Sequence, residues 1–128
     1  MSSYGCIEDL PVWKLARKLS IQIYKITSCT EFRKDFGLRD QIRRAGISLM
    51  SNIAEGFEHE TQAQFISYLG RAKASAGEIR CQLYIASDLS YISDLQFQEA
   101  IALAKECSKQ IYGFIKYLKT LPNSPRVK

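Results

Sequence analysis

The stretch SNIAEGFEHET, residues 51–61, lies between two long segments with helical periodicity. Gly56 suits the left-handed cap that commonly ends a helix, so we expect the preceding helix to end there. Thr61 and Gln64 have the spacing of a capping box, which predicts that the next helix starts directly afterwards. Two helices joined by so short a turn pack as antiparallel neighbours. The stretch therefore predicts a helical hairpin.

The same turn contains the chain's single histidine, His59, among Glu55, Glu58 and Glu60. Carboxylates around an imidazole can form a metal site or an acid–base cluster. They can equally belong to a solvated turn, where acidic groups favour the positive end of the following helix. A di-iron bundle would need two Glu-x-x-His pairs and further glutamates, which a chain with one histidine cannot supply. We therefore predict that His59 is an exposed turn residue without a metal or catalytic role.

Apolar residues recur with helical spacing on both sides of this turn. The segments predicted as helices are residues 10–28, 38–55, 62–89 and 95–121. Asp9 with Pro11 marks the first start, and Asp94 is the expected N-cap of the fourth helix. No segment alternates with a period of two for long enough to form a strand. We predict an all-α, antiparallel up-and-down four-helix bundle, a single domain of residues 1–121, followed by a disordered tail, residues 122–128.

The composition is that of an ordinary folded protein, with 46% hydrophobic and 24% charged residues. No apolar run approaches the roughly 20 residues that cross a bilayer, and the N-terminus lacks a signal-peptide pattern. The four cysteines form no CxxC pair, which favours reduced thiols in a cytoplasmic protein. No nucleotide-binding, hydrolase or metalloprotease motif occurs. We predict a protein that is not an enzyme and that uses no cofactor, metal or membrane.

Three of the predicted helices carry a second apolar stripe beside the one that faces the core. A wide core stripe would explain it, but contact between copies of the chain explains it better. The residues predicted at this oligomer interface are Trp13, Ile47, Met50 and Ala54. The third helix also has a face of small residues, against which we expect another backbone to pack because interior glycines weaken a helix: Gly70, Ala74, Gly77 and Cys81.

The basic residues of this chain, which has a net charge of +5 and a pI near 9.1, follow a pattern. The first and fourth predicted helices carry lysines at the same i, i+4, i+11 spacing, and arginines add charge to the second. We predict that these residues bind nucleic acid: Lys14, Lys18, Lys25, Arg43, Arg44, Lys105, Lys109 and Lys116. Because the first and last helices of such a bundle are neighbours, the two lysine rows could merge into one basic surface. The alternative is a solvated face that serves solubility.

Three stretches carry a resemblance to a known family: DLPVWKLARKL (9–19), QIRRAGISLMSNIAEGF (41–57) and FISYLGRAKASAGEI (65–79). They resemble the four-helix-bundle proteins encoded in intervening sequences of bacterial 23S ribosomal RNA genes. The resemblance implies a bundle that assembles as a ring, typically a homopentamer, with no assigned enzymatic activity. A more distant similarity is to the accessory protein of diversity-generating retroelements, a basic pentamer that associates with a reverse transcriptase and with nucleic acid.

Two functional classes are therefore open. The first is an oligomeric, non-catalytic protein that binds RNA or another nucleic acid through its lysine rows. The second is a scaffold that holds a protein partner, with the charge serving solubility or the partner's acidic surface. Binding that weakens steeply with salt would distinguish the first class from the second.

Overall fold

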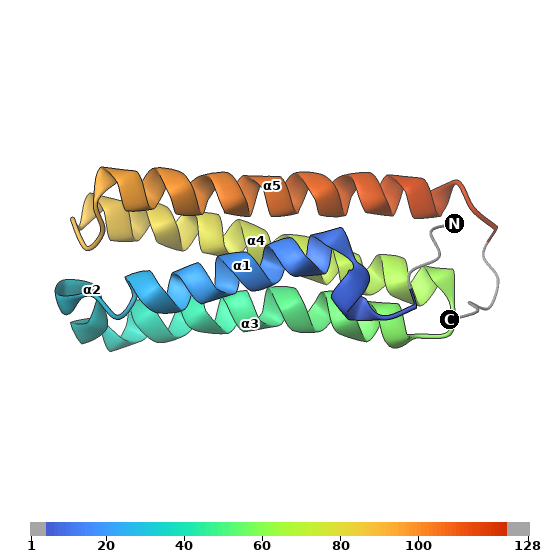
Figure 1. Cartoon of the computed structure of the whole chain (residues 1–128), viewed down its shortest axis with the longest axis horizontal. Coiled ribbons are helices and arrows are strands. Elements are labelled where there is room, and N and C mark those ends of the chain that lie inside the picture. The colour runs from blue at the N-terminus through green and yellow to red at the C-terminus, as the bar shows by residue number, and fades with distance from the viewer. Residues whose placement is uncertain (1–4, 123–128) are drawn as a thin grey trace.

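The structure, a computed structural model, describes residues 5–122 of the 128 in the chain. Among these residues it contains helices and no strand (Figure 1). The elements are a short 3-10 helix and five α-helices: η1 (Ile7–Asp9), α1 (Pro11–Ile26), α2 (Thr30–Lys34), α3 (Phe36–Glu58), α4 (Gln62–Asp88) and α5 (Asp94–Lys119). Of the tail predicted at residues 122–128, residues 123–128 lie outside the described part, as do residues 1–4 of the predicted domain.

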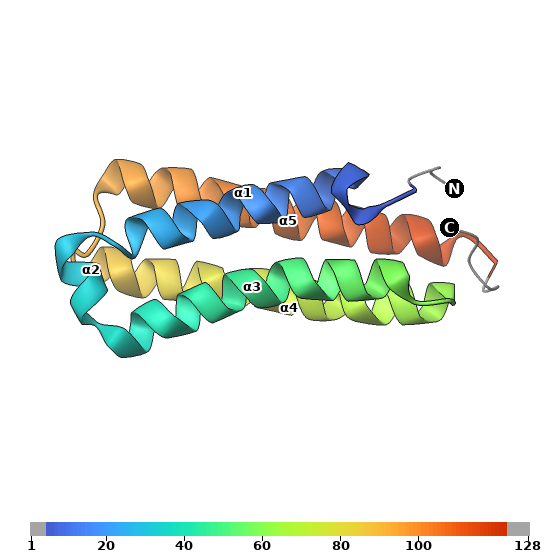
Figure 2. The ribbon, with the colours of Figure 1, turned by 60° about the horizontal axis from the view of Figure 1, so that its bottom comes forward.

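The four long helices form the predicted antiparallel bundle. α3 packs against α1 and α4, and α5 packs against α4 and α1, so the first and last long helices are neighbours. Figures 1 and 2 show consecutive long helices running in opposite directions. The up-and-down helical arrangement is thus confirmed, whereas its assembly as a ring stays a prediction.

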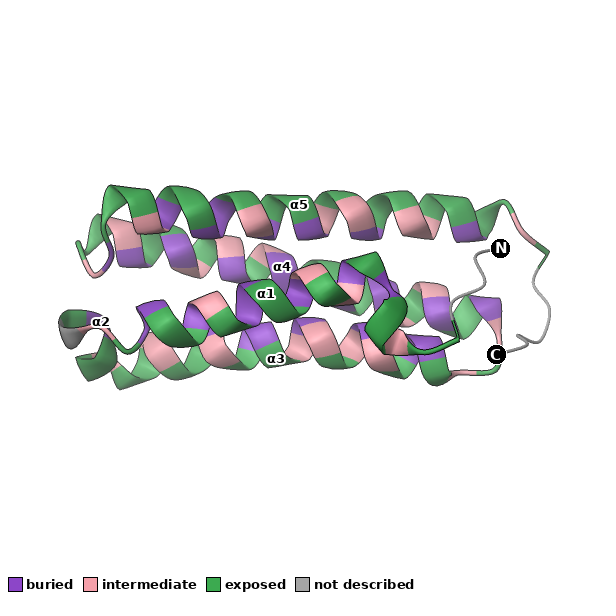
Figure 3. Cartoon of the chain, in the orientation of Figure 1, coloured by how far each residue is buried: buried purple, intermediate pink, exposed green. Residues whose placement is uncertain are grey.

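The core is a single cluster of aliphatic and aromatic side chains on the inner faces of the four helices (Figure 3). Phe65 of α4 is fully buried, and its ring packs edge-on against Phe57 of α3 and Phe114 of α5, with centroids 6.1 and 5.3 Å away. Because the inward residues recur at helical spacing, the periodicity of the sequence predicted this core.

The connection between α1 and α3 contains α2, a short helix that the sequence analysis did not predict. Phe32 of α2 is fully buried, and its ring lies 5.5 Å from the ring of Tyr91 in the α4–α5 connection. The Tyr91 hydroxyl donates to Oδ2 of Asp35 at 3.0 Å, while Oδ1 of Asp35 accepts the Leu38 amide at 3.1 Å and so caps α3. The two connections at this end of the bundle are therefore tied together.

The role predicted for Gly56 is wrong. α3 continues to Glu58, no described glycine has a positive φ, and Gly56 is a buried residue within the helix. A Cβ atom built on Gly56 would lie 2.8 Å from Cβ of Tyr68 and 2.9 Å from Cδ1 of Phe65. The glycine therefore permits close approach of α3 and α4 where the hairpin turns.

The N-cap of α4 is the one predicted from the sequence, whereas that of α5 is a different residue. Thr61 and Gln64 form the predicted capping box of α4. The N-cap of α5 is Ser93, not Asp94: the Ser93 hydroxyl accepts the Gln96 amide at 3.1 Å, and the Gln96 side chain accepts the Ser93 amide at 2.8 Å. Asp94 is instead the first helical residue, where its charge favours the helix N-terminus.

The face of small residues predicted on α4 is open at its two glycines within residues 5–122. A Cβ atom built on Gly70 or on Gly77 would meet nothing within 4 Å. Close packing of another backbone on this face is therefore absent within residues 5–122 of one subunit.

Candidate nucleic-acid interface

The lysines predicted on α1 line a groove. Lys14, Lys18 and Lys25, here called the α1 row, are exposed and border a hollow of about 800 Å³ between α1 and α5. Arg17, which the sequence analysis did not select, borders the same hollow, and Ile21 provides part of an apolar wall. The groove thus combines four cations with apolar surface.

The α5 side of this groove differs from the prediction. The α5 residues that line it are Gln96, Glu99 and Leu103, and none of the predicted lysines is among them. Glu106 lies seven residues after Glu99 and therefore on the same side of the helix. Glu99 thus lies beside the α1 row, and the two lysine rows do not merge across this groove.

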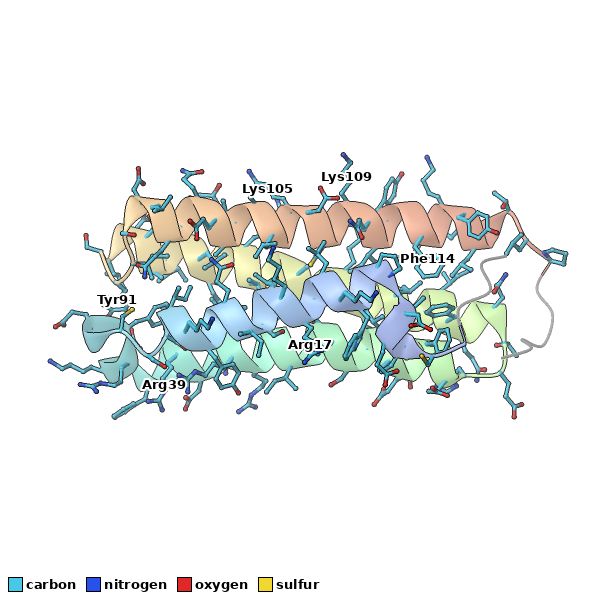
Figure 4. All side chains as sticks on the ribbon, viewed as in Figure 1. Arg17, Arg39, Tyr91, Lys105, Lys109 and Phe114 are labelled. Atoms are coloured by element: carbon cyan, nitrogen blue, oxygen red, sulfur yellow. The ribbon has the colours of Figure 1, made fainter. Side chains whose placement is uncertain are left out.

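The predicted lysines of α5 lie outside this groove. Lys105, Lys109 and Lys116, here called the α5 row, are exposed. Lys116 has its ammonium nitrogen 5.4 Å from the centroid of the Tyr112 ring, and Lys73 of α4 approaches the same ring to 5.9 Å. Lys105 and Lys109 point away from α1 (Figure 4).

This second basic surface, called the α4–α5 face below, consists of the α5 row with Lys73 and Tyr112. Lys73 and Tyr112 were not predicted from the sequence, because their proximity depends on how α4 and α5 are rotated against each other. Tyr112 does show a signal in the sequence, since it follows Lys105 by seven residues and precedes Lys116 by four. Both spacings place residues on one helix face.

The two predicted arginines differ in their freedom to bind a ligand. Arg43 is half-buried: its Nε donates to Oγ1 of Thr27 at 2.8 Å, and its guanidinium lies 4.5 Å above the Tyr24 ring. These contacts join α3 to the end of α1, so Arg43 has a structural role already. Arg44 is exposed.

His59 is half-buried rather than exposed, which corrects the expectation from the sequence. Its ring stacks on Tyr68 with centroids 4.7 Å apart, and the Arg71 guanidinium lies 4.6 Å from the same tyrosine ring. A hollow of about 430 Å³ adjoins His59 and is also lined by Glu55 and Glu58. Within residues 5–122, no group of three or more His, Cys, Asp or Glu side chains is placed to hold a metal ion.

The residues predicted at the oligomer interface lie on the two neighbouring helices α1 and α3. Ile47 is 50% exposed, whereas Trp13, Met50 and Ala54 are half-buried. Trp13 and Met50 also pack against the core, and Arg17 lies 5.9 Å above the Trp13 ring. These residues form an apolar surface with one freely exposed member, Ile47.

Two of the four cysteines, Cys6 and Cys107, have thiols with a raised pKa. Cys107 is fully buried, and burial raises the pKa of its thiol to about 12. The Cys6 thiol donates to Oδ2 of Asp9 at 3.2 Å, and this hydrogen bond raises its pKa as well. Because the thiolate is the nucleophilic form, neither group is a nucleophile at neutral pH.

The described helices show no feature of a membrane span: none has both the length and the apolar character that crossing a bilayer requires. The exposed faces instead carry charged and polar residues between scattered apolar ones. The candidate sites are therefore the two basic surfaces and the apolar surface on α1 and α3.

Comparison with known proteins agrees with this architecture. No curated protein matches the chain. A crystal structure of a protein of unknown function, from the S23 ribosomal protein family of Bacteroides thetaiotaomicron, is 25% identical in sequence and superposes with a TM-score of 0.76. The similarity covers 82% of this chain and 95% of that one. The family model described as 23S rRNA-intervening sequence protein matches residues 8–113, and this chain therefore belongs to that family.

Proposed function

We propose that this protein is a non-catalytic nucleic-acid-binding protein that contacts phosphates through the α4–α5 face and the α1 row. The observation that carries the proposal is the separation of charge on α5. Lys105, Lys109 and Lys116 are exposed and lie outside the groove, and Lys116 shares the Tyr112 ring with Lys73 of α4. Glu99 lines the groove towards α1, and Glu106 follows it by seven residues on the same side of the helix. A face that serves only solubility does not need such a separation, because interspersed positive and negative side chains also keep a protein soluble.

Phosphate contacts fit these residues better than base recognition does. Lysine ammonium groups on exposed helix faces neutralise backbone charge and carry no sequence information. The surfaces named here are the outer faces of a straight bundle (Figure 2), which present no element that enters a groove of a duplex. We therefore expect binding that depends strongly on salt and little on sequence.

Assembly would strengthen such binding. We propose that the chain forms a homo-oligomer. Its expected shape is a ring, typically a homopentamer, as the family resemblance implies. Several copies of a weak phosphate-binding face act together on one nucleic-acid chain, which raises the overall affinity without new contacts. The name of the family refers to 23S rRNA, and RNA is accordingly the first ligand to test.

Fluorescence anisotropy at several salt concentrations tests the proposal. Three double variants remove two charges each: Lys105→Gln/Lys109→Gln on α5, Lys14→Gln/Lys18→Gln on α1, and Arg33→Gln/Lys34→Gln on α2 as the matched control. Each lost phosphate contact lowers the slope of log affinity against log salt by roughly 0.7–0.9. We expect smaller slopes for the first two variants and an unchanged slope for the control.

Two results would contradict the proposal. One is the absence of RNA binding by the wild type even at low salt, and the other is an equal loss in all three variants. The first result would favour the second functional class, a scaffold for a protein partner.

The groove between α1 and α5 supports that alternative, because its cations and the apolar side chains of Ile21, Ile26 and Leu103 suit an acidic amphipathic helix.

A further inference from the structure

Tyr112 is the aromatic residue of the α4–α5 face, and its ring is accessible. The side chain is 54% exposed. Two cations lie close to its ring: the ammonium nitrogens of Lys73 and Lys116 are 5.9 and 5.4 Å from the ring centroid. Lysine side chains are long and flexible, so these groups move away from the ring easily. An exposed aromatic ring is thus surrounded by mobile cations.

Two other exposed tyrosines, Tyr24 and Tyr84, lack this combination. The Tyr24 ring is covered by the Arg43 guanidinium at 4.5 Å, which a hydrogen bond to Thr27 holds in place. The Tyr84 ring packs against Phe97 with centroids 5.1 Å apart. Groups held in place by the fold contact both of these rings, whereas a ligand can displace the flexible lysines beside Tyr112.

We infer that the α4–α5 face binds single-stranded nucleic acid, with an unpaired base stacked on Tyr112 and the flanking phosphates bound by Lys73, Lys105 and Lys116. The inference rests on the proposed function and adds to it the strandedness of the ligand. Proteins that bind single strands without sequence preference combine such a basic surface with aromatic rings on which bases stack.

The energetics favour exchange of a lysine for a base at the ring. A cation over an exposed ring contributes less than a stacked base does. The displaced ammonium group keeps its charge interaction, because the phosphates on either side of the stacked base lie within its reach. In a duplex the bases are stacked on one another inside the helix, so Tyr112 has no base to contact and only the lysines bind.

The test compares an unstructured RNA of CAA repeats, roughly 20 nucleotides long, with an RNA duplex of the same length at one low salt concentration. Tyr112→Leu removes the ring, Tyr112→Phe keeps it, and Tyr24→Leu is the matched control on the α1–α3 side. We expect Tyr112→Leu to weaken single-strand binding roughly five- to 150-fold and to leave duplex binding nearly unchanged. The Phe variant and the control should bind as the wild type does.

The outcomes separate the inference from the proposed function. Binding of both RNAs with equal affinity, or equal loss of both in Tyr112→Leu, would overturn the inference and leave phosphate binding in place. Absence of binding to either RNA would overturn both.

Cross-linking locates the contact without any substitution. RNA that contains 4-thiouridine cross-links on irradiation to the side chains that its bases touch. Trypsin cleaves after Lys109 and Lys116, so the ring of Tyr112 lies on the short peptide 110–116. We expect this peptide to carry the cross-link, and cross-links confined to peptides of α1 would overturn the inference.

Discussion

Gly56 illustrates how one residue type serves two structural purposes that a sequence does not distinguish. A glycine near the end of a helical pattern most often provides a left-handed cap. In this bundle it lies within α3, where the absence of a side chain lets Tyr68 and Phe65 of α4 approach. The two roles leave the same sequence signal, and only the packing of α3 on α4 separates them.

Substitution of Gly56 by alanine should therefore destabilise the protein. The new methyl group would lie 2.8 Å from Cβ of Tyr68, an atom fixed to the backbone that cannot turn away. We expect a loss of about 1–3 kcal/mol, which is typical of an overpacked core, in urea unfolding followed by circular dichroism. Gly77→Ala is the control: Gly77 has open space around it, and alanine should stabilise the helix there by about 1 kcal/mol. Destabilisation by Gly77→Ala would instead indicate that a neighbouring subunit packs on α4.

For the candidate binding residues, the sequence likewise predicts which side chains share a helix face but not which helix that face adjoins. The spacing of Lys105, Lys109 and Lys116 predicted that they share a face of one helix, and exposure of all three agrees with this. The spacing contains no information about which neighbouring helix that face adjoins. Contacts of Tyr112 with Lys73 place the face beside α4, a fact that depends on long-range packing.

At the scale of helices, the four long helices could be predicted from the periodic spacing of apolar residues. The short helix α2 and the N-cap of α5 could not. The predicted ends of the four long helices lie within three residues of those in the structure. α2 is five residues long and too short for a periodic signal, and it is held by the burial of Phe32. The N-cap of α5 was misassigned because Ser93 and Asp94 are both favourable capping residues and stand next to each other.

The capping box of α5 makes a testable distinction between these two residues. Ser93→Ala removes the hydroxyl that accepts the Gln96 amide, and loss of an N-cap typically costs about 1 kcal/mol. Asp94→Asn removes only a charge in the first turn, which is worth roughly 0.3–1 kcal/mol at an exposed position. Urea unfolding should rank Ser93→Ala as the more destabilised variant. The reverse order would mean that Asp94 caps the helix after all.

At the scale of the whole molecule, the predicted association of the bundle depends on which surfaces a subunit offers to its neighbours. An isologous dimer uses one surface twice, whereas a ring requires each subunit to present two different surfaces to its neighbours. The apolar surface on α1 and α3 is one candidate, and Ile47 is its most exposed member. Burial of this surface between subunits would remove apolar area from water, which is the main driving force for association.

We therefore expect light scattering to give a mass several times the 14.6 kDa of one chain. Ile47→Asp should lower that mass, because association would bury an unpaired carboxylate at the contact. Leu95→Asp is the matched control: Leu95, at the start of α5, is 68% exposed, more than Ile47, so a general effect of reduced surface hydrophobicity would appear in both variants. A wild-type mass near that of one chain would contradict association altogether. Loss of the oligomer in Leu95→Asp alone would move the contact to the start of α5.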